Sequence, residues 1–463
     1  MTRPHGARPR GLNARIPQSS LHEGRFSRMF RRLRPAPALP DDVLQGLAEQ
    51  MRDTGAPTSG WGGTVDTGDN PSIPAGYTYL GQFIDHDITF DPQSSLDREN
   101  DPDALVDFRT PRFDLDSVYG SGPADEPFQY TANGTRMLIG ANQTGDADLP
   151  RNTEGVALIG DPRNDENTIV GQLQLLFLQF HNEVADQLDA EGTIAPELRF
   201  EEARRLTRWH YQWVVVEDFL RRICGDDLLN ALWRRDPTSG LPEIHTRFYL
   251  PTKRPYMPVE FSVAAYRFGH SMIRGIYNLS DVVTDRPIFI SGALPDPFAD
   301  LRGFRPLPRQ WTVDWHKFFP VDGATPQPAR RIDSKLSVGL FDLPDAGGSL
   351  AFRNLKRGQA LGLPSGQDVA AAVHAQHVFS GAELGAPEPT PLWFYILKES
   401  ELANGGERLG PVAGRIVAEV LLGLLRGDSQ SFYSQQPTWT PTLPDADGDG
   451  KFTMPDLVKF VTG

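Results

Sequence analysis

Residues 81–92 place one histidine between carboxylates in an otherwise apolar stretch, which restricts how this segment can be buried. Charged groups are costly to bury in an apolar wall, so such residues usually serve a reaction or bind a cation. The apolar spacing allows a helix, in which each residue is turned about 100° from the one before. Gln82, Asp85 and His86 then share an arc of about 100°, whereas Asp87 points about 140° away from Gln82. The segment therefore predicts a helix between two adjacent sites, one catalytic and one for a cation.

Apolar residues at helical spacing recur along the chain and predict a mostly α protein. The chain has no internal repeat and no clear alternation of apolar and polar residues of the kind that strands show. Its 44 glycines and 40 prolines predict many turns and long irregular connections, such as 91–107 and 281–335. We therefore expect one large, mainly α domain with long irregular loops and little β structure. The expected helices span 41–52, 168–188, 197–224, 259–276 and 410–425.

Charge and cysteine content exclude several classes of protein. The net charge of −14 argues against a general nucleic-acid-binding protein, so no nucleic-acid partner is expected. A single cysteine, Cys224, excludes a disulfide framework and a multi-cysteine metal site. Residues 1–34 nevertheless contain nine arginines and only one acidic residue, Glu23. They fit a nucleic-acid or membrane arm, but we favour an extended arm that lies over the acidic body.

The same features suggest how the chain is divided and where it acts. We expect an Arg-rich arm at 1–40, a catalytic domain at 41–440 and a tail at 441–463. No stretch is apolar over transmembrane length, and the first residues contain no apolar run of the signal-peptide type. A cytoplasmic location, or export by a non-classical route, is therefore expected.

Three short motifs each have an ordinary structural explanation and a chemical one. In residues 163–166, acidic side chains precede a predicted helix, where they would offset its dipole. In residues 267–270, Gly269 comes just before His270 inside a predicted helix and costs about 1 kcal/mol relative to alanine. A flat haem lying against that turn, with His270 as axial ligand, would explain it. Asn354 follows later in a turn-like segment and is suited to hold the other ring nitrogen of such a histidine.

Residues 110–116 alternate oxygen-bearing side chains with other residues. Side-chain oxygens with an intervening backbone carbonyl suit a hard cation such as Ca²⁺, and Asp87 could complete the shell from the predicted helix. A solvated acidic turn explains the pattern equally well.

Together these motifs occur in a specific order: GQFIDHD at 81–87, DSVYG at 116–120, Arg-x-x-Glu at 163–166, RFGH at 267–270, and NLKRG at 354–358 ahead of GLP at 362–364. This series resembles the peroxidase–cyclooxygenase superfamily, the animal-type haem peroxidases, and specifically its bacterial single-domain members. The resemblance extends from about residue 82 to residue 366. It implies a peroxidase that reduces hydrogen peroxide through a ferryl-haem intermediate and oxidises bromide, iodide, thiocyanate or phenolic donors.

The resemblance also implies roles for individual residues. His86 would be the general base for peroxide, Arg163 its cationic partner, and Gln82 a residue of the pocket where small anions and water sit. Haem b would be bound through His270, with Asn354 as hydrogen-bond partner of that histidine. Asp85 and Glu166 would form ester bonds to haem methyl groups, and Arg267 and Arg357 would lie near the propionates. The calcium shell would comprise Asp87, Thr110, the backbone oxygen of Arg112, Asp114 and Asp116.

Two departures from the family pattern narrow this expectation. Asn167 stands where some mammalian members carry a methionine that bonds a haem vinyl group, so that third link should be absent. Arg267 stands where cyclooxygenases carry a radical-forming tyrosine, and Tyr266 would lie about 100° around a helix from that position. This argues against the first alternative, a fatty-acid dioxygenase on the same fold. The presence of His86, Arg163 and His270 argues against the second, a non-catalytic calcium-dependent binding protein.

The tail contains a second candidate calcium loop, with Gly450 at the sixth position where an EF-hand loop turns. Its last position is aspartate rather than glutamate, so the loop resembles half of a dockerin-type module, and a single repeat argues against a cohesin-type partner. Alternatively, residues 452–454 and the helix that follows simply close the main fold. The candidate ligands are Asp445, Asp447, Asp449, Lys451, Thr453 and Asp456.

Overall fold

Helices make up most of the regular structure in the computed structural model, as the sequence predicts. The structure describes residues 24–55, 68–89, 106–107, 109–251, 255–290, 298–343, 348–445 and 448–463. The first 23 residues of the arm, most of the expected loop at 91–107 and Asp447 therefore lie outside the described residues. The α-helices are α1 Asp41–Gln50, α2 Gly76–Ile88, α3 Asp116–Tyr119, α4 Thr168–Glu191, α5 Arg199–Val214, α6 Leu220–Cys224, α7 Asp226–Leu232, α8 Val259–Ser262, α9 Leu350–Ala360, α10 Gly366–Ala372, α11 Gly381–Leu384, α12 Leu392–Asn404, α13 Pro411–Gly427, α14 Phe432–Gln435 and α15 Met454–Thr462.

Strands are short and form only small sheets among the described residues. One sheet has three strands in the order β4-β1-β9, and the other strands pair as β10-β11, β12-β3, β13-β2, β5-β6 and β7-β8. The strands are β1 Gly24–Ser27, β2 Arg52–Asp53, β3 Asp69–Pro74, β4 Val106–Asp107, β5 Gly140–Ala141, β6 Ala147–Asp148, β7 Trp233–Arg235, β8 Pro242–Ile244, β9 Met257–Pro258, β10 Ile276–Tyr277, β11 Arg286–Pro287, β12 Pro328–Arg330 and β13 Leu336–Ser337.

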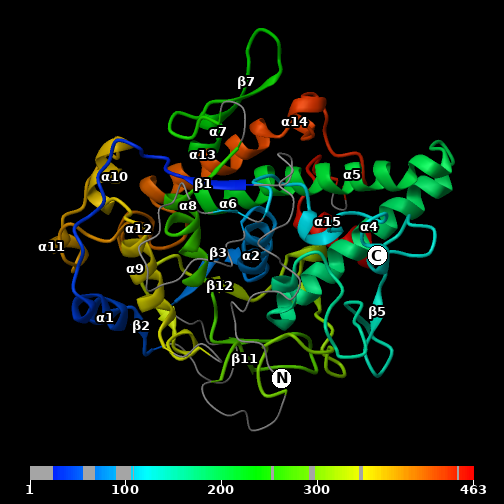
Figure 1. Ribbon diagram of the computed structural model, residues 1–463, viewed down its shortest axis with the longest axis horizontal. Helices are drawn as coiled ribbons and strands as arrows, with labels where there is room; N and C mark the ends of the chain where they lie inside the picture. Colours follow the sequence, from blue (N-terminus) through cyan, green and yellow to red (C-terminus); the bar gives the residue numbers. More distant parts are fainter. Residues whose placement is uncertain are drawn as a thin grey trace.

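Helix α2 runs through the centre of the molecule and packs against α4 (Figure 1). Phe83 of α2 stacks on Phe177 of α4 with ring centroids 4.5 Å apart, and the edge of Tyr211 from α5 closes the group. All three rings are fully buried, and burial of such side chains contributes roughly 1.5–3 kcal/mol each. These contacts hold the polar residues of α2 in a defined orientation.

The predicted helix at 197–224 is nearly continuous but changes its winding. Helix α5 passes into a π-helical turn, Val215–Phe219, which leads directly into α6. The widened turn lets one helix present side chains to two different regions of the molecule. Phe219, for example, is fully buried beside Tyr266, whereas Glu217 is only partly buried.

The prediction of one helix over 259–276 is wrong. Helix α8 ends at Ser262, a 3-10 helix covers Ala265–His270, and β10 begins at Ile276. In a 3-10 helix, side chains three residues apart are eclipsed, so Arg267 and His270 project from the same side. Both of them contact Asn354 of α9, and these tertiary contacts take precedence over α-helical propensity.

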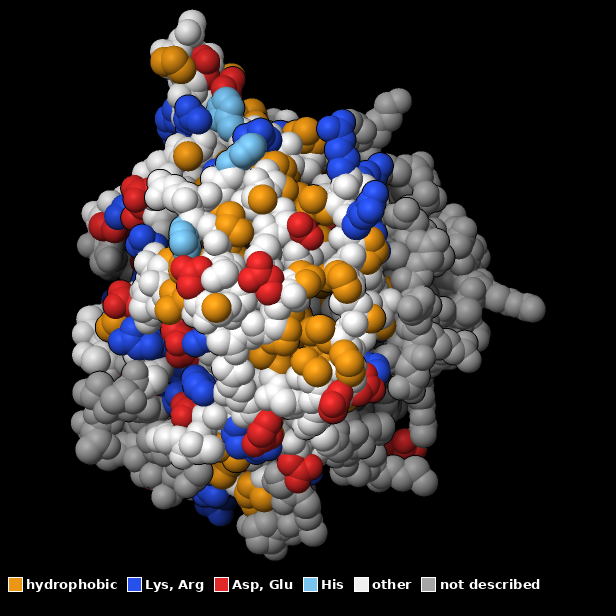
Figure 2. Space-filling view, turned by 90° about the vertical axis from the view of Figure 1, so that its left-hand side faces the viewer, with side chains coloured by type: hydrophobic (Ala, Val, Ile, Leu, Met, Phe, Trp, Pro, Cys, Tyr) orange, Lys and Arg blue, Asp and Glu red, His pale blue; other side chains and the backbone are white. Residues whose placement is uncertain are grey.

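Both ends of the described chain pack into the body. At the N-terminal end, the amide N–H groups of Met29 and Phe30 donate to the buried carboxylate of Glu260. At the other end, Phe452 and Met454 are buried and α15 packs on α4. No helix within the described ranges is long and apolar enough to cross a membrane. On the face drawn in Figure 2, the described basic side chains lie in small groups separated by acidic and apolar ones.

Candidate active site and cation site

A cavity of about 370 Å³ brings together most of the residues singled out in the sequence. Apolar walls come from Phe219, Ile288 and the segment near Leu340. A Cβ added at Gly269 would meet no atom within 4 Å, so the wall at this position is flat and open toward the cavity. Seven predicted site residues line the cavity: Gln82, Asp85, His86, Arg163, Glu166, Arg267 and His270.

His86 projects from α2, and a chain of amides determines which of its nitrogens carries the proton. Its Nδ1 lies 2.7 Å from Oδ1 of Asn164, whose Nδ2 donates to Oε1 of Gln174 at 2.7 Å. The amide oxygen of Asn164 therefore faces the imidazole, and Nδ1–H donates to it. Burial and the charge of Arg163 lower the pKa of His86. The neutral ring thus presents Nε2 as a proton acceptor, 3.7 Å from Oε1 of Glu166.

Arg163 is held against the same helix by a buried carboxylate. Its guanidinium donates to Asp161, and its Nη2 also donates to the backbone oxygens of His86 at 2.9 Å and Thr89 at 2.6 Å. Asp161 is fully buried; burial opposes its ionisation, but Arg163 and Arg109 together hold its pKa well below the usual value. Arg163 therefore keeps its position beside His86 and lends a positive charge to the cavity wall.

His270 enters the cavity from the 3-10 helix, and its Nδ1 is engaged by α9. Nδ2 of Asn354 lies 2.8 Å from Nδ1 of His270, while Nη1 of Arg267 donates to Oδ1 of Asn354 at 2.8 Å. Nε2 of His270 is thus the ring nitrogen left for the cavity. Arg267 is buried, which lowers its pKa to about 10 although Asp85 opposes the shift. Arg357 is also buried in α9 but is not among the described lining residues.

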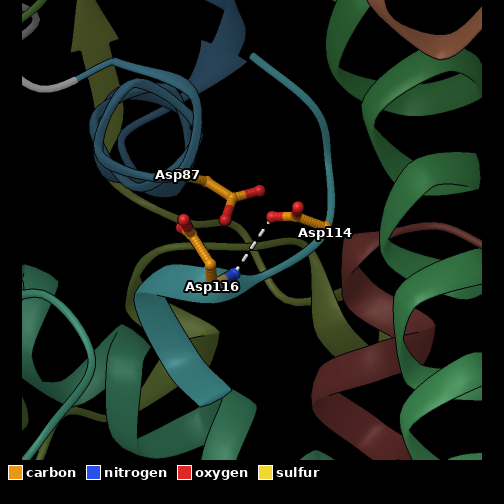
Figure 3. Close-up of side chains that lie close together, drawn as sticks. All are labelled: Asp87, Asp114 and Asp116. Atoms are coloured by element: carbon orange, nitrogen blue, oxygen red, sulfur yellow. Dashed lines mark hydrogen bonds between the residues drawn. The ribbon is translucent and has the colours of Figure 1, made fainter. Parts of the chain in front are cut away.

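Three carboxylates converge beside α2 (Figure 3), and none of them lines the cavity. Oxygens of Asp87, Asp114 and Asp116 all lie within 4.8 Å of one another, and Thr110 donates to Asp114 at 2.6 Å. Burial and the neighbouring Asp114 and Asp116 raise the pKa of Asp87 well above its usual value. Oδ2 of Asp87 is buried and forms no hydrogen bond with the described residues. Such a set of crowded, unsatisfied hard oxygens fits a cation such as Ca²⁺.

The remaining expected ligand, Arg112, lies in the same loop, where its amide N–H donates to the backbone oxygen of Thr110 at 2.7 Å. The cation site is also joined to the cavity through Arg109, which the sequence analysis missed. Arg109 lies 3.2 Å from Asp116 and 2.8 Å from Asp161, the carboxylate that holds Arg163. Its position immediately before Thr110 could have suggested a contact with the cation site. Its second partner, Asp161, is 52 residues away in the chain, so that contact had no local signal.

Comparisons with known proteins identify the family to which the chain belongs. A family model for the animal haem peroxidase matches residues 95–384, which is more than half of the chain. The chain belongs to this family. The matched range includes Arg163, His270 and Asn354, whereas the segment with His86 precedes it.

Individual relatives are distant and longer. A chorion peroxidase of Aedes aegypti is 24% identical over 306 residues, covering 64% of this chain and 37% of the relative. A thyroid peroxidase of Rattus norvegicus is 26% identical over 362 residues, covering 68% of this chain and 37% of the relative. The chain therefore spans little more than a third of the length of these curated relatives.

Solved structures show the fold alone at this level of identity. Peroxidase A from Dictyostelium discoideum superimposes with a TM-score of 0.68 at 15% identity, covering 98% of this chain and 96% of that one. The fatty acid alpha-dioxygenase of Oryza sativa gives a TM-score of 0.56 at 16% identity, covering 87% of this chain and 77% of that one. The family's haem would fit the cavity described above, since two histidines from separate elements and a flat glycine wall face it.

Two residues that depart from the family pattern have definite places. Asn167 lines the cavity, accepts from the amide of Val170 to cap α4, and donates to Gln82 at 3.2 Å. Tyr266 also lines the cavity, with a buried hydroxyl that has no hydrogen-bond partner among the described residues. Tyr266 thus shares a cavity with His270, although it is still one residue away from the position that Arg267 occupies.

The C-terminal loop uses its side chains differently from the first cation site. Asp445 accepts from the amides of Gly448 and Gly450, and Asp456 accepts from the amide and hydroxyl of Thr453 to cap α15. Asp449 accepts from the amide of Lys451 at 2.8 Å. Among the described residues, the acidic cluster with metal-ligand spacing is the one at Asp87. A second calcium site therefore stays a prediction, and the burial of α15 agrees with the simpler alternative of a segment that closes the fold.

Proposed function

We propose that the chain is a haem peroxidase that reduces hydrogen peroxide and oxidises bromide, iodide, thiocyanate or phenolic donors. The observation that carries the proposal is the pair of histidines in one cavity, each with its Nδ1 engaged by an asparagine. One histidine offers a basic nitrogen; the other would bind iron through Nε2 once its Nδ1 carries the ring proton and donates to the oxygen of a turned Asn354 amide. Family membership and the peroxidase relatives support the same activity.

In this proposal His86 accepts a proton from one oxygen of peroxide at Nε2 and returns it to the departing oxygen. Such general acid–base catalysis contributes typically 10²–10⁴-fold to a rate. Burial favours the neutral, proton-accepting form of His86, and Asn164 prevents its ring from turning. Arg163 stabilises the negative charge that develops as the O–O bond breaks. The haem, when bound, supplies the redox chemistry itself.

The same proposal assigns the residues that would hold the haem. His270 would bind iron through Nε2, and Arg267 with Arg357 would face the propionates. Asp85 and Glu166 would form the two ester bonds, since both carboxylates line the cavity. Haem that stays with the protein during acid–acetone extraction is the expected result. Complete extraction would remove both ester assignments while leaving His270 as ligand.

His86→Ala should lower the rate of peroxide-dependent iodide oxidation by about 10²-fold or more, because the proton acceptor is lost. The measurement is steady-state iodide oxidation by protein whose haem content is matched by its Soret absorbance. His316→Ala is the control, because His316 is an exposed histidine away from the cavity. Turnover of the His86 variant at the wild-type rate would remove this residue from the mechanism.

The fatty-acid dioxygenase remains a second candidate because Tyr266 places an unpartnered phenol in the cavity. Oxygen uptake with palmitic acid and no added peroxide separates the two candidates. We expect no uptake, since Arg267 occupies the position that the dioxygenase pattern requires for tyrosine. A protein that loads haem but shows neither activity would instead support the calcium-dependent binding protein.

A further inference from the structure

A second cavity, of about 200 Å³, lies on another face of the helix that runs from α5 through the π-helical turn to α6. Trp213, Glu217 and Arg221 line it at four-residue spacing, which places them on one face. Phe219, which lines the cavity that contains His86 and His270, lies two residues after Glu217 in the π-helical turn and projects to another side of it. The two cavities share no lining residue. Strand β7 and helix α14, which lie above α6 in Figure 1, supply further lining residues of the second cavity.

Four aromatic side chains line this cavity, together with three arginines, two prolines and Glu217. The ring of Phe432 lies 5.7 Å from Trp213, 5.5 Å from Trp439 and 6.4 Å from Trp233, measured between centroids. The rings are tilted by 43–79° to one another, so they offer both faces and edges to a ligand ring, and such aromatic pairs contribute about 0.5–1.5 kcal/mol beyond simple burial. The indole Nε1 of Trp213 is buried and has no acceptor among the described residues.

The charged groups of the lining carry a net positive charge in a chain of net charge −14. Glu217 is already paired with Nε of Arg221 at 2.7 Å. Arg234 and Arg235 of β7 instead donate to backbone oxygens, of Ala231 at 2.8 Å and Gly240 at 3.1 Å. Neither of these two guanidinium groups forms an ion pair with a described residue. Two cations beside an aromatic wall favour a planar anion over a neutral or cationic ligand.

We propose that this cavity binds a single-ring aromatic carboxylate. The ring would lie among Trp213, Phe432 and Trp439, and the carboxylate would accept from Arg234 or Arg235, each of which can bind such a group in a bidentate manner. The volume suits one ring, since an apolar cavity of about 150 Å³ accommodates benzene. Nothing in the proposed peroxide chemistry uses this cavity, so the binding site is independent of the haem.

Benzoate titrated into the haem-loaded protein, with binding followed by calorimetry and tryptophan fluorescence, tests the proposal. We expect saturable quenching, and an affinity reduced at least about tenfold in R234Q/R235Q, equal to about 1.4 kcal/mol. Arg309→Gln, an exposed substitution outside both cavities, should leave the affinity unchanged. Benzamide, which has the same ring without the charge, should bind about tenfold more weakly than benzoate.

The Soret band separates the two cavities during the same titration. It should stay constant as benzoate binds. Equal affinity of wild type and R234Q/R235Q would overturn the proposal, as would a Soret shift that follows saturation. Absence of any binding by benzoate to folded wild-type protein would overturn it as well. None of these results depends on peroxidase turnover.

Discussion

At the residue scale, a neutral side chain, Asn164, determines which ring nitrogen of His86 can accept a proton. Asn164 accepts from Nδ1 of His86 because its own amide nitrogen is taken by Gln174. The oxygen end of the amide is thereby fixed toward the imidazole. The amide nitrogen of Gln174 has no partner among the described residues, so Gln174 could turn and donate to a carboxylate at position 164.

Replacement of Asn164 therefore separates orientation from packing. Asn164→Leu removes the acceptor and should lower the rate of peroxide-driven oxidation about 10- to 100-fold, because His86 can then present the wrong nitrogen. Asn164→Asp keeps an acceptor at the same place and should retain most of the rate. Stopped-flow mixing with peroxide, at haem loading matched by Soret absorbance, measures both. Equal losses in the two variants would indicate a structural role instead of a positioning role.

At the element scale, α2 is shared by two sites whose charges are linked through Arg109. Asp87 faces the cation site on one side of the helix, and His86 faces the cavity on the other. Arg109 contacts Asp116 of the first site and Asp161 beside the second, and all of these groups are largely buried. Without Arg109, Asp116 would lose its counter-charge and Asp161 would keep only Arg163, and breaking such buried pairs typically costs 3–5 kcal/mol.

Arg109→Gln should thus reduce the free energy of unfolding by about 3–5 kcal/mol when calcium is chelated. The loss should be smaller at saturating calcium, because the bound ion would replace part of the charge that Asp116 has lost. Denaturant unfolding of both proteins, with chelator and with calcium, measures the difference. Arg309→Gln again provides an exposed control. The same loss under both conditions would contradict a cation at Asp87, Asp114 and Asp116.

At the scale of the whole molecule, features set by residues close together in the sequence could be predicted from it. Features set by contacts between residues far apart in the sequence could not. The α4 helix was predictable because its apolar spacing is local, and the two faces of α2 followed from helical geometry alone. The break between α8 and the 3-10 helix was not, because it depends on contacts with Asn354, 84 residues from His270. Asn164 and Arg109 were missed for the same reason, since their partners at His86 and Asp161 are distant in the chain.

The packing of α12 on α13 makes the stability of the whole fold depend on pH. Glu399 of α12 is fully buried and accepts from the amide of Val412 at 2.9 Å, but its Oε1 has no partner among the described residues. Burial raises the pKa of Glu399 to about 8, above its ordinary value of 4.5. Between these two pH values the folded state holds a proton that the unfolded state has released, so stability falls as pH rises and levels off above about 8.

In the Glu399→Gln variant the side chain is neutral at every pH and still accepts from the amide of Val412. The stability of this variant should therefore not fall as pH rises from 5 to 8. Its unfolding free energy relative to wild type should rise by about 1–3 kcal/mol from pH 5 to pH 8, since each pKa unit corresponds to 1.36 kcal/mol. Thermal or urea unfolding across this range measures the difference. Glu154→Gln, at an exposed glutamate, should show no such trend. A constant difference between the Glu399 variant and wild type would show that Glu399 ionises normally in the folded protein.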